Sequence, residues 1–494
     1  PPPLVERVVS LITDPHHPVD ADRLLVVTFS NAAAQEMRQR IAARLWEQSR
    51  LEPDSPNLQR QLLLLESAQI STVHAFCSQL LHSYFHRLGL PSQFRVGEEQ
   101  ELRVLRQEVL QGVLREMYEE ASPEFLDLAE LLSSARSDQK LEQTILDFYA
   151  FVRNHPFYEG WLRRALTFYD DGAPVEETPW GQILLSDARQ ALGYALSLSE
   201  LAQGELHSES QIEEAYLPAF LEDRALLERL LAVVEEGDWD RCCQVVAAAA
   251  FGKIGRLPGS YPYPEKKKLV TDLRSETKEI VKTLQQKCFL MDGRQYRQDA
   301  ALQRPMIEKL SQVLLAFDRA LSREKLERGL LDFDDQQHYA LALLYEERDG
   351  ALRPTDVAQQ LSRRYEAILV DEYQDTNEIQ ELIFQAISRE MQNLFLVGDV
   401  KQSVYRFRQA RPELFLRKKE AYPTYDGTRY PAKIALGANF RTRGETTGLV
   451  NDLFRAIMNP TVGEMEYGEE DALVSRAVFD DPGPVPVTLA LLDA

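Results

Sequence analysis

The residues best suited to chemistry are two adjacent carboxylates, Asp371 and Glu372, which directly follow the apolar run 367–370. Such a run, bounded by charge, is typical of a strand covered on both faces. In open α/β sheets, ligands bind outside the carboxyl ends of such strands. One carboxylate there could hold Mg²⁺ while the other activates water, as in nucleotide hydrolases. The alternative is a strand that leads into a solvated acidic turn, and residues 371–375 alone do not decide between the two interpretations.

A second segment of this kind follows another apolar run. Gln402 lies just after that run, where a carboxamide could contact a terminal phosphate or the attacking water. Residues 401–420 contain seven basic residues against two acidic ones, although the whole chain is acidic. The aromatic residues among them, Tyr405, Phe407 and Phe415, could stack on unpaired bases while the basic residues meet phosphates. Alternatively, Tyr405 and Phe407 pack in the core and the basic side chains form surface ion pairs.

Four short apolar runs that end in polar residues predict the buried strands that position this chemistry, at residues 24–29, 69–73, 367–370 and 393–397. Ser30 follows the first run and is a good helix N-cap. Behind it, apolar residues recur at helical spacing, at Ala34, Met37, Ile41 and Leu45. The same alternation of strand, turn and helix surrounds the later runs. The sequence therefore predicts an α/β fold, with a parallel sheet and flanking helices.

The region 93–330 has a different character, with long helical patterns rich in Leu, Glu, Gln and Ala. We interpret it as a helical insertion. Within it, residues 252–268 contain Gly, Pro and Tyr and end in Glu-Lys-Lys-Lys, which predicts an exposed loop. That charge run is more simply a solvated face than a DNA contact. After residue 439, the pattern predicts a helix through 449–457 and an unfinished strand at 485–492.

Composition limits the possible functions. The chain has 494 residues, which is too long for one hydrophobic core, so several domains are expected. Its formal net charge is −22, so any contact with nucleic acid must be local rather than through bulk charge. Four cysteines without paired metal spacing are too few for a disulfide framework, which fits a reducing, cytoplasmic setting. No apolar run approaches the roughly 20 residues that cross a bilayer, so a membrane role is not expected.

Taken together, these segments resemble the superfamily 1 DNA helicases of the UvrD and Rep type, and within them the AddA subunits of bacterial AddAB helicase-nucleases. Residues 28–37 look like helicase motif Ia, 71–77 like motif Ib, 371–375 like motif II, 398–410 like motif III and 436–442 like motif IV. Residues 331–335, Leu-Asp-Phe-Asp-Asp, are similar to a family segment that precedes motif II. The motifs frame about half of the chain.

The resemblance implies a RecA-like P-loop NTPase helicase core with a large helical insertion, in which the first core strand and the P-loop are missing. The implied division places the first RecA-like domain in two parts, the insertion between them, and the start of a second RecA-like domain after them. The corresponding residues are 1–92 and 331–430 for the first domain, 93–330 for the insertion and 431–494 for the second domain.

The resemblance also assigns roles to individual residues, with ATP and Mg²⁺ as cofactors. Asp371 would hold Mg²⁺, and Glu372 would orient or deprotonate the attacking water. Gln402 would sense the γ-phosphate, and Arg441 would reach it from the second domain. Phe440, next to Asn439, corresponds to the aromatic residue that stacks on adenine. The implied DNA contacts are Thr28, Phe29, Asn31, Thr72, His74, Tyr405, Phe407 and Arg408. For His74, the simpler alternative outside this motif is a satisfied, half-buried imidazole.

One family element is absent from the sequence. No Gly-rich loop ending in Gly-Lys-Thr occurs, and the chain begins with Pro1, Pro2 and Pro3, which have no N–H groups to cradle phosphates. We therefore expect a fragment of an active helicase subunit that hydrolyses little ATP alone. The implied partners are single-stranded and duplex DNA and an AddB-like subunit. Two alternatives stay open, a nonenzymatic DNA-binding or assembly subunit and a nucleotide hydrolase with no nucleic-acid role.

Overall fold

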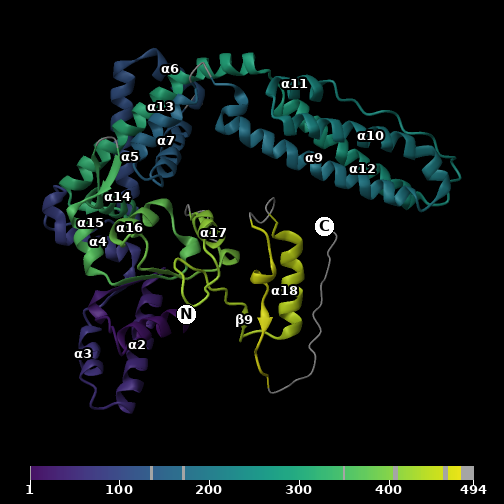
Figure 1. Ribbon diagram of the computed structural model, residues 1–494. Helices are drawn as coiled ribbons and strands as arrows, with labels where there is room; N and C mark the ends of the chain where they lie inside the picture. Colours follow the sequence, from purple (N-terminus) through teal and green to yellow (C-terminus); the bar gives the residue numbers. More distant parts are fainter. Residues whose placement is uncertain are drawn as a thin grey trace. The chain divides into compact units, whose positions relative to one another are not determined.

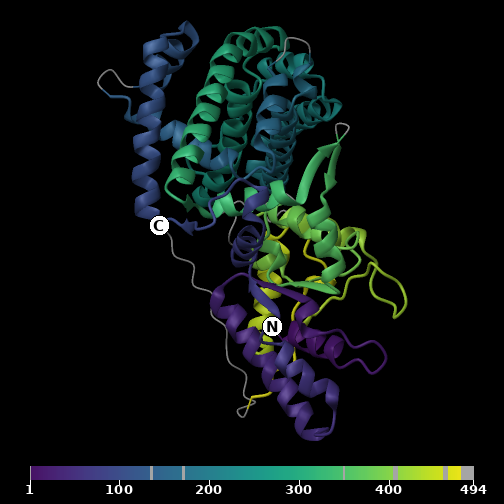
Figure 2. The same cartoon turned by 90° about the vertical axis from the view of Figure 1, so that its left-hand side faces the viewer.

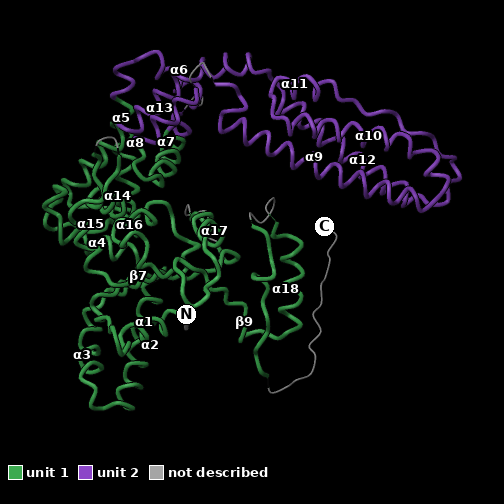
Figure 3. Tube along the Cα trace, viewed as in Figure 1, with its two compact units in different colours: residues 1–115, 142–158, 316–494 green, residues 116–141, 159–315 purple. Residues whose placement is uncertain are grey.

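The structure is a computed structural model that describes residues 2–133, 137–169, 173–348, 351–403, 410–459 and 465–479. The chain forms two compact units, coloured separately in Figure 3. Unit 1 contains residues 1–115, 142–158 and 316–494, and unit 2 contains residues 116–141 and 159–315. No helix in the described part of the chain is long and apolar enough to span a bilayer.

A four-stranded parallel sheet lies at the centre of unit 1. Its strand order is β2 (Gln69–Thr72), β1 (Leu24–Thr28), β7 (Ala367–Val370) and β8 (Leu394–Leu396). All four predicted strands are therefore confirmed, and the register pairs Val27 with both Ser71 and Val370. Since β1 and β2 come from the start of the chain and β7 and β8 from beyond residue 366, the sheet unites the two ends of the predicted α/β region.

Helices cover both faces of this sheet, which explains why its central strands, β1 and β7, are apolar over almost their whole length. Leu25, Val27 and Ile368 face a core formed with α4 (Val73–Tyr84), α14 (Phe333–Leu344), α15 (Asp356–Arg364) and α16 (Glu378–Ile387). Val26 and Leu369 face a second core formed with α1 (Pro2–Ile12), α2 (Asn31–Leu51) and α3 (Pro56–Leu64). The α/β prediction is confirmed, and Figure 1 shows the two sets of helices.

The helix predicted behind the first strand is α2, and its details match the sequence pattern. Ser30 is its N-cap and accepts a hydrogen bond from the backbone N–H of Ala33 at 3.1 Å. Its buried residues are the four predicted ones, Ala34, Met37, Ile41 and Leu45. This outcome follows from local rules alone, a cap that satisfies a free N–H group and an apolar stripe that must be covered.

Smaller elements complete unit 1. Strands β5 (Tyr345–Arg348) and β6 (Ala351–Pro354) pair antiparallel, drawn as adjacent green arrows in Figure 2. Strand β3 (Arg95–Val96) pairs with β4 (Leu330–Leu331), and β9 (Ala438–Asn439) with β10 (Val474–Ser475), both in parallel. The later helices are α17 (Pro412–Ala421) and α18 (Gly444–Ile457), which confirms the helix predicted through 449–457. The strand predicted at 485–492 lies outside the described residues.

Unit 2 is helical, as predicted for the insertion. It contains α6 (Pro123–Leu132), α9 (Pro179–Leu206), α10 (Ser210–Glu236), α11 (Trp239–Ala247) and α12 (Pro264–Thr283). Four further helices have residues in both units, α5 (Glu99–Glu120), α7 (Gln139–Val152), α8 (Tyr158–Thr167) and α13 (Gly293–Glu327).

The prediction that residues 252–268 form a loop is wrong at its end. Residues 264–268 are the first turn of α12. Pro264 occupies the start of the helix, where the missing N–H group costs nothing, and Glu265 lies in the first turn, where the helix dipole favours an acid. The proline that indicated a turn is thus a helix start.

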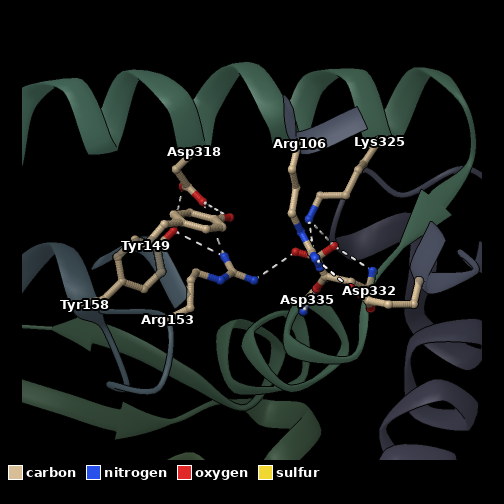
Figure 4. Close-up of polar contacts among 9 residues, drawn as sticks. Arg106, Tyr149, Arg153, Tyr158, Asp318, Lys325, Asp332 and Asp335 are labelled. Atoms are coloured by element: carbon tan, nitrogen blue, oxygen red, sulfur yellow. Dashed lines mark hydrogen bonds and ion pairs between the residues drawn. The ribbon is translucent and has the colours of Figure 1, made fainter. Parts of the chain in front are cut away.

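A buried ion network joins three segments of unit 1 (Figure 4). Lys325 at the end of α13 donates to Asp332 at 2.9 Å and to Asp335 at 2.6 Å. Arg153 donates to Asp335 at 2.8 Å and lies 3.5 Å from Asp318, which also accepts from two tyrosine hydroxyls. These five charged side chains are all buried. Because each charge has an opposite partner, the network avoids the high cost of an isolated buried ion.

The network also fixes where α14 begins. Asp332 is the N-cap of α14 and accepts from the backbone N–H of Asp335 at 2.8 Å. Asp335 accepts in return from the backbone N–H of Asp332 at 2.9 Å, so the two form a capping box. Two of the three acids of the Leu-Asp-Phe-Asp-Asp segment, Asp332 and Asp335, therefore have a structural role, at the start of α14.

We predict that Lys325→Met destabilises unit 1 by about 3–5 kcal/mol, because it leaves Asp332 and Asp335 with one fewer buried cation. The measurement is a urea unfolding curve compared with wild type. Arg328→Met is the matched control, since Arg328 pairs with Glu324 in an exposed position and should cost no more than about 1 kcal/mol. Equal effects of the two substitutions would contradict the assigned role of the network.

Candidate functional site

Asp371 and Glu372 lie at the carboxyl edge of the sheet, directly after β7. The sheet's hydrogen bonding continues into them. The backbone N–H of Asp371 donates to the carbonyl of Val27 at 2.9 Å, and that of Tyr373 donates to Val397 at 2.9 Å. The segment is thus held between the ends of β1 and β8, which is the position where open α/β sheets bind ligands.

The backbone turns sharply at Glu372. Its φ of 51° and ψ of 43° lie in the left-handed region, which is uncommon for a residue with a Cβ. Its neighbours Asp371 and Tyr373 are buried, whereas Glu372 is exposed. The turn therefore separates the exposed Glu372 side chain from the buried side chains on either side of it. Such conformations cost about 1–3 kcal/mol and cluster at functional sites.

Gln374 is a residue of this site to which the sequence analysis gave no role. Its Nε2 donates to the Glu372 carboxylate at 2.8 Å, and its Oε1 accepts from the backbone N–H of Asp399 at 3.0 Å. The buried amide thus ties the exposed carboxylate to the segment after β8. Gly398 makes room for it, since a Cβ there would lie 2.4 Å from Gln374 Oε1. The signal in the sequence was a Gln between two acids, followed by a glycine after the next strand.

Asp399 is a second residue without a predicted role. Its carboxylate accepts from Gln402 Nε2 at 2.9 Å and pairs with Lys401 Nζ at 2.9 Å. Asp399 therefore orients the side chain that was predicted to sense a phosphate. Together with Gln374, it places Glu372 and Gln402 on one hydrogen-bonded path along the sheet edge.

Burial changes the acidity of two carboxyls at this edge. Desolvation, reinforced by the adjacent Glu372, raises the pKa of Asp371 to about 6. The same two causes raise the pKa of Asp375 to about 6. A nearby cation would favour the charged form of either carboxyl and lower its pKa again.

The donor set suits magnesium better than a cation that needs a complete protein cage. Asp371 offers a largely buried carboxylate at the strand end. The described residues include no group of three or more His, Cys, Asp or Glu that could hold a metal ion. Mg²⁺ is usually held by one or two carboxylates together with substrate phosphates and water.

The residues predicted to contact DNA from motifs Ia and Ib meet at the same edge of the sheet. Thr28 and Thr72 are register partners at the ends of β1 and β2. Thr28 is buried and its hydroxyl donates to the carbonyl of Ser30, while Thr72 caps α4 by accepting from Ala75 N–H at 3.2 Å. Their hydroxyls shape the two turns.

The exposed members of this set follow those threonines. Phe29 and Asn31 are exposed just after β1, and His74 is half-buried in the first turn of α4. Phe333 lies beside His74, with ring centroids 5.2 Å apart and nearly perpendicular planes. Phe333 is 57% exposed, and no role was predicted for it because its segment was recognised by resemblance alone. The structure thus brings an unpredicted aromatic ring to this face.

The basic and aromatic segment is described only in part. Tyr405, Phe407 and Arg408 lie outside the described residues. Phe415, one of the aromatic residues that could have stacked on bases, is instead partly buried against the core, 5.6 Å from the Tyr373 ring. The described basic residues that form ion pairs with carboxylates are Lys401, Arg411, Lys418 and Lys419. For this part of the segment, the ion-pair alternative holds.

The residues of motif IV lie on a separate short element. Asn439 ends β9, and its Oδ1 accepts from the backbone N–H groups of Arg441 at 2.8 Å and Thr442 at 2.9 Å. This turn presents Phe440, which is 72% exposed, and Arg441, which is also exposed. Among the described residues, no hydrogen bond or ion pair joins Arg441 to the acids after β7. The structure therefore does not bring these two predicted groups into contact.

A parallel sheet covered by helices on both faces, with paired acids at its carboxyl edge and a helical insertion within its chain, has the fold of a RecA-like core. The N-terminal domain of the UvrD/REP helicases matches residues 3–423. The chain belongs to the UvrD/REP helicase family.

Known relatives agree with this assignment. The chain is 36% identical over 485 residues to an ATP-dependent helicase/nuclease subunit of Ruminiclostridium cellulolyticum, covering 96% of this chain and 39% of that protein. The protein of the same name from Acetivibrio thermocellus is 36% identical, over 98% of this chain and 39% of its own length. The one from Clostridioides difficile is 34% identical, over 97% and 38%. The chain thus spans less than half the length of these relatives.

We predict that Gly398→Ala disturbs the site by forcing Gln374 away from Glu372, because the added methyl would overlap Gln374 Oε1. The expected cost is about 1–3 kcal/mol of stability, typical of an overpacked interior. The measurement is the thermal unfolding midpoint.

The control for this experiment is Gly112→Ala in α5, where a Cβ would meet no atom within 4 Å. In a helix interior, this change should stabilise the protein by about 0.5–1 kcal/mol. If Gly398→Ala behaves like Gly112→Ala, Gln374 does not require the glycine.

Proposed function

We propose that this chain supplies the ATP-hydrolysing core of a DNA helicase subunit, part of a helicase-nuclease that acts in the repair of double-strand breaks. The family assignment supports helicase chemistry, and the names of the relatives support the expectation of a nuclease activity in the same assembly. The observation that carries the proposal is the buried Gln374 amide, which holds Glu372 at the sheet edge and joins it to the Asp399 segment.

In this proposal, the two acids after β7 have different roles, one in binding the metal and one in activating water. Asp371 holds Mg²⁺, which supplies charge neutralisation on the ATP phosphates when bound. Glu372 takes a proton from the attacking water, because its side chain is exposed while Gln374 holds its carboxylate at the sheet edge. Gln402, oriented by Asp399, contacts the γ-phosphate or the water. On the turn made by Asn439, Arg441 contacts the γ-phosphate and Phe440 stacks on the adenine.

The DNA track runs along the same edge of the sheet in this proposal. Phe29, Asn31 and His74 are the exposed or half-exposed predicted contacts, and Phe333 adds an aromatic face beside His74. Aromatic stacking binds bases without sequence preference, as a translocating motor requires. Thr28 and Thr72 act by shaping the turns that carry these residues.

Three further elements complete the proposal. The 494 residues contain no Gly-Lys-Thr loop, so they turn over little ATP without a phosphate cradle supplied from elsewhere. The partners are single-stranded and duplex DNA and an AddB-like subunit, and the setting is the cytoplasm.

The second candidate function is a nonenzymatic DNA-binding or assembly subunit, which would not depend on the Glu372 carboxylate.

We predict that Glu372→Gln lowers the DNA-stimulated ATPase kcat by about 10²-fold or more, which is the usual contribution of a positioned acid or base. The substitution is made in a longer natural chain that contains this sequence and a phosphate loop, and the affinity for single-stranded DNA is measured in parallel. The control is Glu366→Gln, at the opposite end of β7, where the carboxylate pairs with Arg23 and Arg389. Intact ATPase in Glu372→Gln would remove Glu372 from the proposed catalytic role. Absence of ATPase from the longer chain with the wild-type sequence, with binding of DNA retained, would favour the nonenzymatic function.

We also predict that Phe333→Ala weakens binding of single-stranded DNA by about 5- to 150-fold, the equivalent of one lost stacking contact. Binding of a fluorescent oligonucleotide at fixed salt measures the effect. Trp46→Ala is the control, because Trp46 is 59% exposed but lies 15 residues into α2, roughly 20 Å from the sheet edge. Unaltered affinity in Phe333→Ala would remove this residue from the DNA track.

A further inference from the structure

We infer that Gln337 is a positioning residue that links the DNA contact His74 to the helix that follows the acids Asp371 and Glu372. The inference rests on the function proposed above, and it gives that function a physical connection between the DNA track and the nucleotide site. Gln337 itself lies outside the segments that carry the predicted chemistry.

Gln337 lies in the second turn of α14 and is 4% exposed, so its amide must find partners inside the protein. Its Nε2 lies 3.2 Å from Nε2 of His74 in α4. Its Oε1 accepts from Nδ2 of Asn377 at 3.4 Å. One side chain thus spans two helices that leave the sheet from different strands.

Asn377 connects this amide to the nucleotide site. It is the N-cap of α16, and its Oδ1 accepts from the backbone N–H of Gln380 at 2.9 Å. It lies two residues after the short helix Tyr373–Asp375, which contains Gln374. A change in the orientation of Asn377 therefore acts on the segment that holds Glu372.

The hydrogen bonds that connect His74, Gln337 and Asn377 can have only one donor-to-acceptor direction. Because Asn377 uses Oδ1 to cap α16, only its Nδ2 is available to Gln337. Gln337 must then present Oε1 to Asn377 and Nε2 to His74, so the facing ring nitrogen of His74 has to accept. That nitrogen cannot accept from Gln337 and also donate to a DNA phosphate. Binding of DNA at this nitrogen therefore changes the bonding of Gln337 and, through it, the cap of α16.

Helix α14 is anchored firmly enough to transmit such a change. Its first turn is held by the buried ion network of Lys325, Asp332 and Asp335 (Figure 4). Nε2 of His338, the residue after Gln337, lies 2.7 Å from the backbone carbonyl of Arg153. With contacts on both sides of Gln337, α14 cannot shift freely to absorb a loss at His74.

The test is Gln337→Met in a longer natural chain that hydrolyses ATP. Methionine keeps the length and volume of the side chain but has no amide to share. We expect the ratio of kcat at saturating single-stranded DNA to kcat without DNA to fall on the order of tenfold, within the range of coupling between two sites. The Kd for single-stranded DNA should change less than that ratio, because Gln337 itself is buried.

Two further variants separate coupling from simple destabilisation. Gln336→Met changes the adjacent buried glutamine, which makes no hydrogen bond to His74 or Asn377 among the described residues, and should leave the ratio unchanged. Asn377→Ser keeps a good N-cap but is too short to reach Gln337, so it should lower the ratio as Gln337→Met does. If His74, Gln337 and Asn377 act as one hydrogen-bonded series, the double variant of Gln337 and Asn377 should lower the kcat ratio no further than either single variant does.

Each other outcome has a definite meaning. A normal ratio in Gln337→Met, or an equal loss in Gln336→Met, overturns the inference while the proposed function stands. Additive losses in the double variant do the same, because they show two independent effects. Absence of DNA-stimulated ATPase in the longer chain with the wild-type sequence would overturn the proposed function itself, and the inference with it.

Discussion

The parallel pairing of β7 between β1 and β8 is the interaction on which the site depends. A strand buried on both faces has no access to water, so each of its N–H and C=O groups needs a partner in the protein. Two neighbouring strands provide these partners, and the bonding extends to Asp371 and Tyr373 beyond the strand itself. The position of the acids is therefore set by the core of unit 1 and does not depend on the flexibility of a loop.

Beyond this edge, two kinds of buried polar contact have different effects. The ion network around Asp335 matches opposite charges and fixes where α14 starts. The amides of Gln374 and Gln337 each donate and accept at once, so each connects two segments with a defined direction. Charges thus anchor elements, whereas amides orient the side chains that meet DNA and nucleotide in the proposed function.

Much of the fold could be predicted because it depends on residue order alone. The strands follow from apolar runs, and α2 follows from a serine cap and an apolar stripe, which are properties of neighbouring residues. Where two local rules compete, the sequence alone did not give the right answer or gave none. Pro264 could end a segment or start a helix, and the structure shows the helix. Phe415 could face DNA or the core, and only the position of Tyr373 shows that it packs inside.

By itself, the sequence determined the four strands and their alternation with helices, the two acids after an apolar run and the helicase motifs, because each is a pattern of close neighbours along the chain. Only the tertiary structure decided that Gln374 holds Glu372, that Phe333 lies beside His74, and that Gln337 lies between His74 and Asn377. These contacts join residues from different strands and helices. The distances between them depend on the packing of the sheet and its helices, which no local pattern specifies.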